Sequence, residues 1–204
     1  MPTEQALLVD FGGVLTSDVF ASFEAFCRAE ALEPTLVRDR FMGDPEARGL
    51  LADLETGKLA EPEFEAAFAA VLGVGGEGLI ARLFDGMGPD EAMLEAVRRA
   101  KRAGVRTGLL SNSWGEAGYD RSIFAELFDA TVISGEEGIR KPDPAIYALA
   151  AQRLGLPAER IVYVDDLPGN LKPARALGMR TVHHARAQET VPELEALLGV
   201  SLRD

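Results

Sequence analysis

The stretch ALLVDFGG at residues 6–13 decides the fold of this chain. It joins a short apolar run to an aspartate and two glycines, and the unalternated run is typical of a strand buried on both faces of a parallel sheet. Compact runs of the same kind follow at residues 105–111 (VRTGLLS), 161–164 (IVYV) and 180–183 (RTVH), with a weaker one at 130–134 (ATVIS). The sequence therefore predicts a parallel sheet built from these runs.

Helical patterns separate the predicted strands. Residues 90–103 follow a proline, carry acids in the first turn and bases in the last, and stop at Gly104. Residues 144–154 and 168–177 each begin at a proline and stop at a glycine. This alternation of strands and helices predicts an α/β fold with a parallel sheet.

Residues 16–85 break the alternation, because they contain helical patterns near 18–31, 45–55 and 61–72 and no convincing strand. We expect them to form a helical domain inserted after the first strand, with residues 1–15 and 86–204 as the α/β core. Gly73, Gly75 and Gly78 have the spacing of a dinucleotide-binding loop, but they follow a helical pattern instead of a strand. We therefore interpret them as a linker.

The composition excludes several classes of protein. With 33 acidic and 21 basic residues the net charge is −12, which argues against nucleic-acid and membrane partners. Most of this acid excess falls in residues 16–85, and it disfavours a large polyanionic substrate. The single cysteine, Cys27, rules out an intrachain disulfide and is expected to be a small buried side chain. The acidic start of the chain and its short apolar runs predict a cytoplasmic protein.

Polar side chains stand where the predicted strands end, or in the loops that follow. Each taken alone has an ordinary structural explanation, as a helix cap, a turn residue or a solvated loop charge. Together they favour one site, since ligands of parallel sheets bind at the carboxyl ends of the strands. The set comprises Asp10, Ser111, Asn112, Lys141, Asp165, Asp166 and Asn170.

These residue types match one kind of chemistry. Three neighbouring carboxylates repel unless a cation lies among them, and oxygen ligands of this kind suit Mg²⁺. A metal ion, a lysine, a hydroxyl and backbone N–H groups can together hold a phosphoryl group. A carboxylate beside that group can attack it and form an aspartyl phosphate.

Four motifs, in this order and spacing, resemble those of the haloacid dehalogenase-like hydrolase superfamily. They are LLVDFGGVLT (7–16), GLLSNSWG (108–115), GIRKPDPAIY (138–147) and VYVDDLPGNLKPARALGM (162–179). The segment LETGKLAEPEFEAAFAAVLG (54–73) is similar to the helical C1 cap found in one subgroup. The resemblance implies a Rossmann-like core, a cap inserted after the first strand, and a phosphatase-like hydrolase.

The resemblance also implies roles for the metal-site residues. Asp10 would be the nucleophile and a Mg²⁺ ligand, with the backbone carbonyl of Gly12 and the carboxylate of Asp165 as further ligands. Asp166 would hold metal-bound waters or orient its neighbours, and Asn170 would brace the loop.

The substrate side follows by the same resemblance. Ser111 and the amide of Asn112, together with Gly12, would bind the phosphoryl group, and Lys141 would neutralise its charge and that of Asp10. Trp114 is a candidate for the substrate mouth, with ordinary packing as the alternative.

Gly12 departs from the phosphatase pattern. Phosphatases of the superfamily usually carry at this position a second aspartate, which protonates the leaving group. Three explanations stay open: an acidic leaving group such as an anomeric or acyl phosphate, a substitute acid from water or another side chain, or inefficient turnover.

The sequence thus favours a Mg²⁺-dependent phosphatase of a small phosphorylated metabolite, acting as a monomer or homodimer. A hydrolytic dehalogenase is one alternative, but the pair Asp165–Asp166 counts against it, because dehalogenases of the superfamily usually lack these acids. A non-catalytic binding protein of the same fold is another. In residues 16–85, Arg38, Arg40, Phe41 and Arg48 are candidates for substrate choice, with solvated or core positions as the alternative.

Overall fold

The computed structural model describes residues 5–115, 119 and 121–203 of the chain. Within them lies a five-stranded sheet with the order β3-β2-β1-β4-β5, and every neighbouring pair of strands is parallel. This arrangement confirms the predicted α/β fold class. The strands are β1 (Ala6–Val9), β2 (Arg106–Ser111), β3 (Ala130–Ile133), β4 (Ile161–Asp165) and β5 (Arg180–His183).

Strand β1 occupies the centre of the sheet, and its side chains alternate between two apolar layers. Leu7 and Val9 point to one face, and Ala6 and Leu8 to the other. Each of the four residues is at most 1% exposed, which explains why the run shows no polar alternation.

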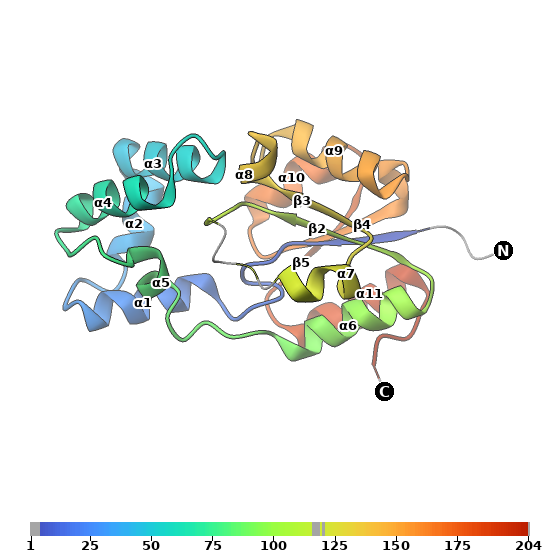
Figure 1. The fold of residues 1–204 in the computed structure, drawn as a ribbon. Coiled ribbons are helices and arrows are strands. Elements are labelled where there is room, and N and C mark those ends of the chain that lie inside the picture. Colours follow the sequence, from blue (N-terminus) through green and yellow to red (C-terminus); the bar gives the residue numbers. More distant parts are fainter. Residues whose placement is uncertain (1–4, 116–118, 120, 204) are drawn as a thin grey trace.

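Helices cover both faces of the sheet (Figure 1). One face carries α9 and α10, and the other carries α6, α7 and α11. Their bounds are α6 (Glu91–Arg102), α7 (Phe124–Leu127), α9 (Pro144–Leu154), α10 (Pro168–Ala176) and α11 (Ala187–Leu198), with the short α8 (Ser134–Glu137) after β3 and 3₁₀ turns at Arg121–Ile123 and Ala158–Arg160. Helices α6, α9 and α10 match their predicted positions, whereas α7, α8 and α11 were not predicted.

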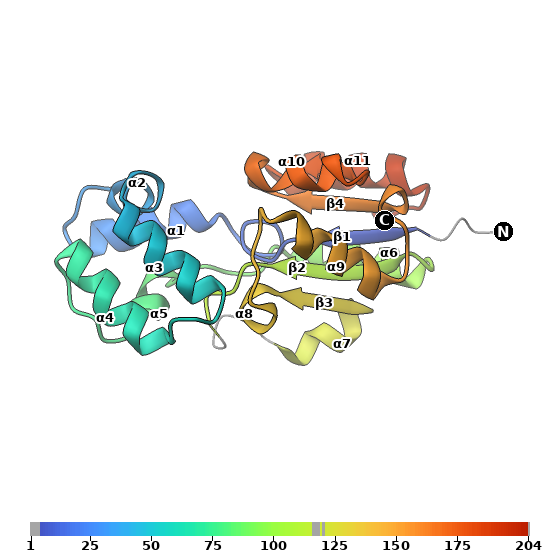
Figure 2. The same cartoon turned by 90° about the horizontal axis from the view of Figure 1, so that it is seen from above.

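Residues 16–85, here called the cap, lie beyond the carboxyl ends of the strands (Figures 1 and 2). The cap has an apolar cluster of its own, in which Phe64, Phe68, Leu79 and Leu83 are fully buried. We keep the division into a cap and a core as a proposal supported by this separate cluster. The cap helices are α1 (Val19–Ala29), α2 (Leu36–Gly43), α3 (Pro45–Glu55), α4 (Glu61–Leu72) and α5 (Leu79–Leu83).

The two chain segments that join the cap to the core run side by side. Ser17 N–H donates to the Gly88 carbonyl at 2.8 Å, and Asp90 N–H donates to the Leu15 carbonyl at 2.9 Å. The three glycines of the suspected linker lie between α4 and α5, where Gly73 ends α4 with a φ of +74°. No helix in the described part of the chain is long and apolar enough to cross a membrane.

Candidate active site

The acidic side chains predicted at the strand ends meet at one edge of the sheet. Asp10 directly follows β1 and Asp165 ends β4, while Lys141 lies in the loop between α8 and α9. Asp10, Asp165 and Asp166 each present a carboxylate oxygen within 4.8 Å of the others. We call these three residues the acidic cluster.

Lys141 is buried inside this cluster. Its Nζ lies 2.8 Å from Asp10 Oδ1 and 2.8 Å from Asp165 Oδ2, and the residue is 1% exposed. Burial disfavours the ammonium, but the two carboxylates outweigh it and raise the pKa of Lys141 above its usual value. Burial also raises the pKa of Asp10, against the charge of Lys141 and with the support of Asp165 and Asp166. One lysine therefore faces three acids.

Asp165 is fully buried, and donors occupy both of its oxygens. Oδ1 accepts hydrogen bonds from Leu167 N–H at 2.8 Å and from Asn170 Nδ2 at 3.0 Å. Oδ2 accepts from Lys141 Nζ at 2.8 Å and from the Tyr163 hydroxyl. Burial on its own would raise the pKa of Asp165, but Lys141 and these hydrogen bonds bring it below its usual value.

Asp166 is placed differently, because it lines the cavity above the cluster and Asp165 does not. Burial, followed by the charge of Asp165, raises the pKa of Asp166 to about 6. The Gly13 backbone approaches this carboxylate so closely that a Cβ there would lie 2.4 Å from Asp166 Oδ2. Gly13 also has a φ of +72°, so this turn requires glycine on both counts.

The residues after β2 hold the lysine loop. Asn112 Oδ1 accepts from Lys141 N–H at 2.9 Å, and Asn112 Nδ2 donates to the Lys141 carbonyl at 3.2 Å. The Ser111 hydroxyl lies 2.8 Å from that of Tyr119, a residue that the sequence analysis missed. Burial raises the pKa of Tyr119 to about 12, so it is a neutral hydrogen-bonding group at physiological pH.

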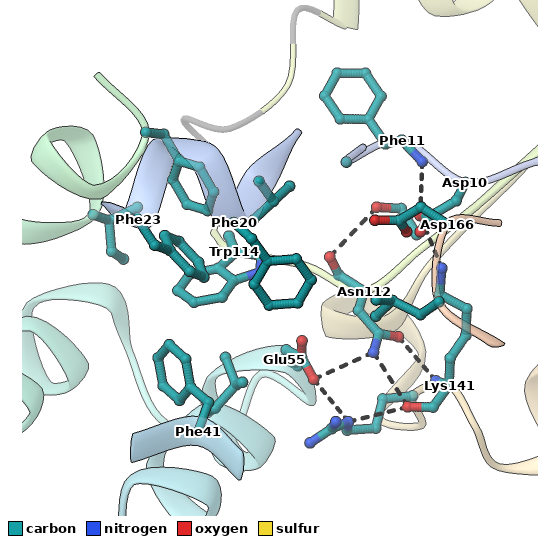
Figure 3. Close-up of a pocket in the computed structure, with 18 of the residues that line it drawn as sticks. Asp10, Phe11, Phe20, Phe23, Phe41, Glu55, Asn112, Trp114, Lys141 and Asp166 are labelled. Carbon is teal, nitrogen blue, oxygen red and sulfur yellow. Dashed lines mark hydrogen bonds and ion pairs between the residues drawn. The ribbon is translucent and has the colours of Figure 1, made fainter. Parts of the chain in front are cut away.

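The cap and the core enclose a cavity of about 550 Å³ between them (Figure 3). Its core side presents the predicted site residues except Asp165, and its cap side is largely aromatic and aliphatic. Trp114 lines the cavity and also packs against cap rings, with centroid distances of 5.0 Å to Phe84 and 5.7 Å to Phe41. The packing of Trp114 is therefore confirmed, and its place at the substrate mouth stays a prediction.

Of the other candidate residues, some line the cavity and some do not. Arg38 and Phe41 line the cavity, whereas Arg40 pairs with Asp44 at 3.2 Å and Arg48 lines a separate pocket beside α3. Cys27 is fully buried in the cap, as expected.

Glu55 is the main cavity residue that the sequence analysis missed. It ends α3 and is 5% exposed, and its Oε2 forms an ion pair with Arg140 Nε at 2.7 Å and accepts a hydrogen bond from Asn112 Nδ2 at 3.3 Å. Its backbone carbonyl accepts from the Ser134 hydroxyl. Glu55 therefore fastens the cap to two loops of the core.

A signal for Glu55 was present in the sequence. An acid in the last turn of a helix opposes the helix dipole, and breaches of such local rules tend to mark functional positions. Burial raises the pKa of Glu55 to about 7, against the lowering effect of Arg140 and Lys141.

The fold and the site define an α/β protein with a buried carboxylate–lysine centre at the carboxyl ends of its strands. The family model described as haloacid dehalogenase-like hydrolase matches residues 4–178, and the chain belongs to that family. An enzyme of the family from Bacteroides thetaiotaomicron, solved with magnesium and inorganic phosphate, has the same fold at a TM-score of 0.70 and 22% identity. That match covers 94% of this chain and 99% of the other.

Curated relatives include proteins of several kinds. A sesquiterpene phosphatase of Aspergillus oryzae is 28% identical over 151 residues, which cover 71% of this chain and 77% of that protein. Acyl-CoA dehydrogenase family member 10 of Mus musculus is 38% identical over 112 residues, or 54% of this chain. Bifunctional epoxide hydrolase 2 of Sus scrofa is 35% identical over 117 residues, again 54% of this chain. The match spans only 10% and 21% of the last two proteins.

The raised pKa of Glu55 predicts a pH dependence of stability. Between about pH 4.5 and 7 the folded chain keeps a proton that the unfolded chain releases, so ionisation of Glu55 destabilises the fold as the pH rises. The free energy of unfolding of the wild type, minus that of Glu55→Gln, should fall on the order of 3 kcal/mol across this window. Urea unfolding at a series of pH values measures it, and a constant difference would contradict the prediction.

Proposed function

We propose that this hydrolase is a Mg²⁺-dependent phosphatase of a small phosphorylated compound, with Asp10 as the nucleophile. One observation carries the proposal: three carboxylates and a buried lysine converge at the strand ends, at the floor of the cavity between cap and core. The phosphatases among the relatives support it, as does the structural neighbour that holds magnesium and phosphate.

The acidic cluster fits a divalent cation, because three carboxylates face a single lysine; burial and then the charge of Asp165 raise the pKa of Asp166. Asp10, the Gly12 carbonyl and one more carboxylate would hold the ion. The sequence analysis assigned this last place to Asp165, but both Asp165 oxygens are engaged by protein donors. We therefore propose Asp166 as the ligand, with Asp165 holding Lys141 in place. Bound Mg²⁺ supplies positive charge for the phosphoryl oxygens.

The chain's own residues would act in two steps. An Asp10 oxygen attacks the phosphorus as the bond to the leaving oxygen breaks, which gives an aspartyl phosphate; water then hydrolyses it and frees Asp10. Lys141, Ser111 and the amide of Asn112 hold the phosphoryl oxygens as charge develops on them. Asn170 braces the loop by donating to Asp165.

A hydrolytic dehalogenase is the second candidate. An L-2-haloacid dehalogenase shares the fold at a TM-score of 0.63 and 24% identity, which bears on the fold alone. A dehalogenase nucleophile attacks carbon and has no need of a cation, so the clustering of Asp166 with Asp10 favours the phosphatase.

Hydrolysis of acetyl phosphate and p-nitrophenyl phosphate tests the proposal. We expect phosphate release with Mg²⁺, none with EDTA, and a loss of at least about 10³-fold in Asp10→Asn, which removes the nucleophile and keeps the side-chain shape. Circular dichroism checks that the variant is folded. Activity that survives EDTA would refute the proposal, and turnover of 2-chloropropionate alone would identify a dehalogenase. A lack of turnover with either class of substrate would favour a binding protein.

Exchanging the two neighbouring acids separates their roles. Asp166→Asn should raise the Mg²⁺ concentration for half-maximal activity by about 10–100-fold and leave stability nearly unchanged. Asp165→Asn should destabilise the fold by about 3 kcal/mol, since it strips a buried lysine of one partner. Magnesium titration and urea unfolding measure the two effects. If Asp165→Asn alone weakened the response to Mg²⁺ at unchanged stability, the original assignment of Asp165 would be right.

A further inference from the structure

We propose that the cap cavity selects phosphate monoesters of large apolar alcohols, such as long alkyl or prenyl chains, over sugar phosphates. This inference rests on the proposed phosphatase function and specifies the substrate of the same site. It is carried by the side chains that face the acidic cluster across the cavity.

The wall opposite the cluster is hydrophobic (Figure 3). Phe20, Phe23, Phe41 and Trp114 stand together on the cap side in the view, away from Asp10 and Lys141. Val19, Leu51, Ile80, Phe84 and Met87 continue this apolar lining. A cavity of about 550 Å³ lies within the range that encloses a whole organic ligand, so an apolar group fits inside with its phosphate at the floor.

The charged groups of the wall are already engaged with the protein. Arg140 pairs with Glu55 at 2.7 Å, and Arg38 lies 3.7 Å from Asp39. The side chain of Glu65 accepts from Ile80 N–H at 2.9 Å. In the described part of the chain, each cation lining the cavity therefore faces an acid. Sugar hydroxyls would therefore give up water for few replacement hydrogen bonds on this wall.

The energetics favour the same class of ligand. An apolar chain that enters this cavity leaves water, and each methylene group adds about fourfold to affinity while room remains. The selectivity should therefore appear as a rise in kcat/KM with chain length that levels off when the cavity is full.

A series of n-alkyl phosphates from ethyl to decyl, beside acetyl phosphate and glucose 6-phosphate, tests the inference in Mg²⁺. We expect kcat/KM to rise with chain length and to exceed that for glucose 6-phosphate by at least about 100-fold at decyl. Phe20→Ser should flatten the dependence on length. Leu177→Ser, at a partly exposed leucine that is not a cavity residue, should keep it.

Binding without turnover gives a second readout, because Trp114 is the chain's single tryptophan. Titration with n-decyl phosphonate should change its fluorescence at lower concentrations than ethyl phosphonate. A preference for glucose 6-phosphate with no dependence on chain length would overturn the inference and leave the phosphatase intact. Failure to hydrolyse any of these phosphates, acetyl phosphate included, would refute the proposed phosphatase function and the inference with it.

An alkoxide leaving group needs a proton, and Gly12 has none to give. The geometry points to Glu55 as the proton donor. Its Oε2 is fixed by Arg140 and Asn112, while its Oε1 bonds to none of the described residues and the carboxyl borders the cavity (Figure 3). The Oε1–H proton would pass to the leaving oxygen as its bond to phosphorus breaks, and the water that later attacks the aspartyl phosphate would return a proton to Oε1. Burial raises the pKa of Glu55 to about 7, which keeps this proton available near neutrality.

A leaving-group series distinguishes this role from a structural one. Glu55→Gln should lower kcat/KM for alkyl phosphates by about 10²-fold or more, but for acetyl and p-nitrophenyl phosphates by less than about tenfold, since those groups depart without a proton. The matched variant Glu65→Gln, at a cavity carboxyl that accepts Ile80 N–H, should alter all esters alike. Equal losses on all esters in Glu55→Gln would show a structural role and refute the proton transfer.

Discussion

The whole site depends on the buried ammonium of Lys141. A lone charge at 1% exposure would be prohibitively unstable, and it is tolerated because Asp10 and Asp165 each lie 2.8 Å away. These acids end two adjacent strands, β1 and β4, so the charge contact ties the lysine loop to the centre of the sheet. Asn112, after β2, holds the same loop through its backbone. The amino group of Lys141 thereby links the ends of two strands, and its backbone links the end of a third.

The contact with Lys141 also makes the two neighbouring aspartates at the end of β4 differ in pKa. The carboxylate that pairs with Lys141 is buried and saturated with donors, so its pKa falls. Its neighbour, Asp166, has no ion pair with Lys141, and burial, followed by the charge of Asp165, raises its pKa to about 6. Asp165 ends β4 and Asp166 lies just beyond it; the side chain of Asp165 is fully buried, whereas Asp166 lines the cavity. Two neighbouring residues therefore differ in role: Asp165 is held by protein donors, whereas Asp166 borders the cavity and can bind a ligand.

The sheet and the acids could be predicted from the sequence because both have local patterns, namely apolar runs and the polar residues that follow them. It missed helix α11, whose pattern contains Pro192, and the cap helix α2, in which Val37 is the buried residue. The partners of Glu55 could not be predicted, because these contacts join segments far apart in the chain. The choice between Asp165 and Asp166 as the metal ligand depends on hydrogen bonds to the two carboxylates, which motif spacing does not show.

The cap and the core contribute different kinds of side chain to the cavity. The core supplies the charges at the strand ends, and the cap supplies rings and aliphatic side chains. Trp114 belongs to the core loop after β2, yet its ring lies 5.8 Å from that of Phe23 and 6.0 Å from that of Phe64 in the cap. Separating cap from core would expose these faces to water and would also break the Glu55–Arg140 pair. Apolar ring contacts on one wall and the Glu55–Arg140 contact on the other thus hold the cap against the core, and the same side chains shape the cavity.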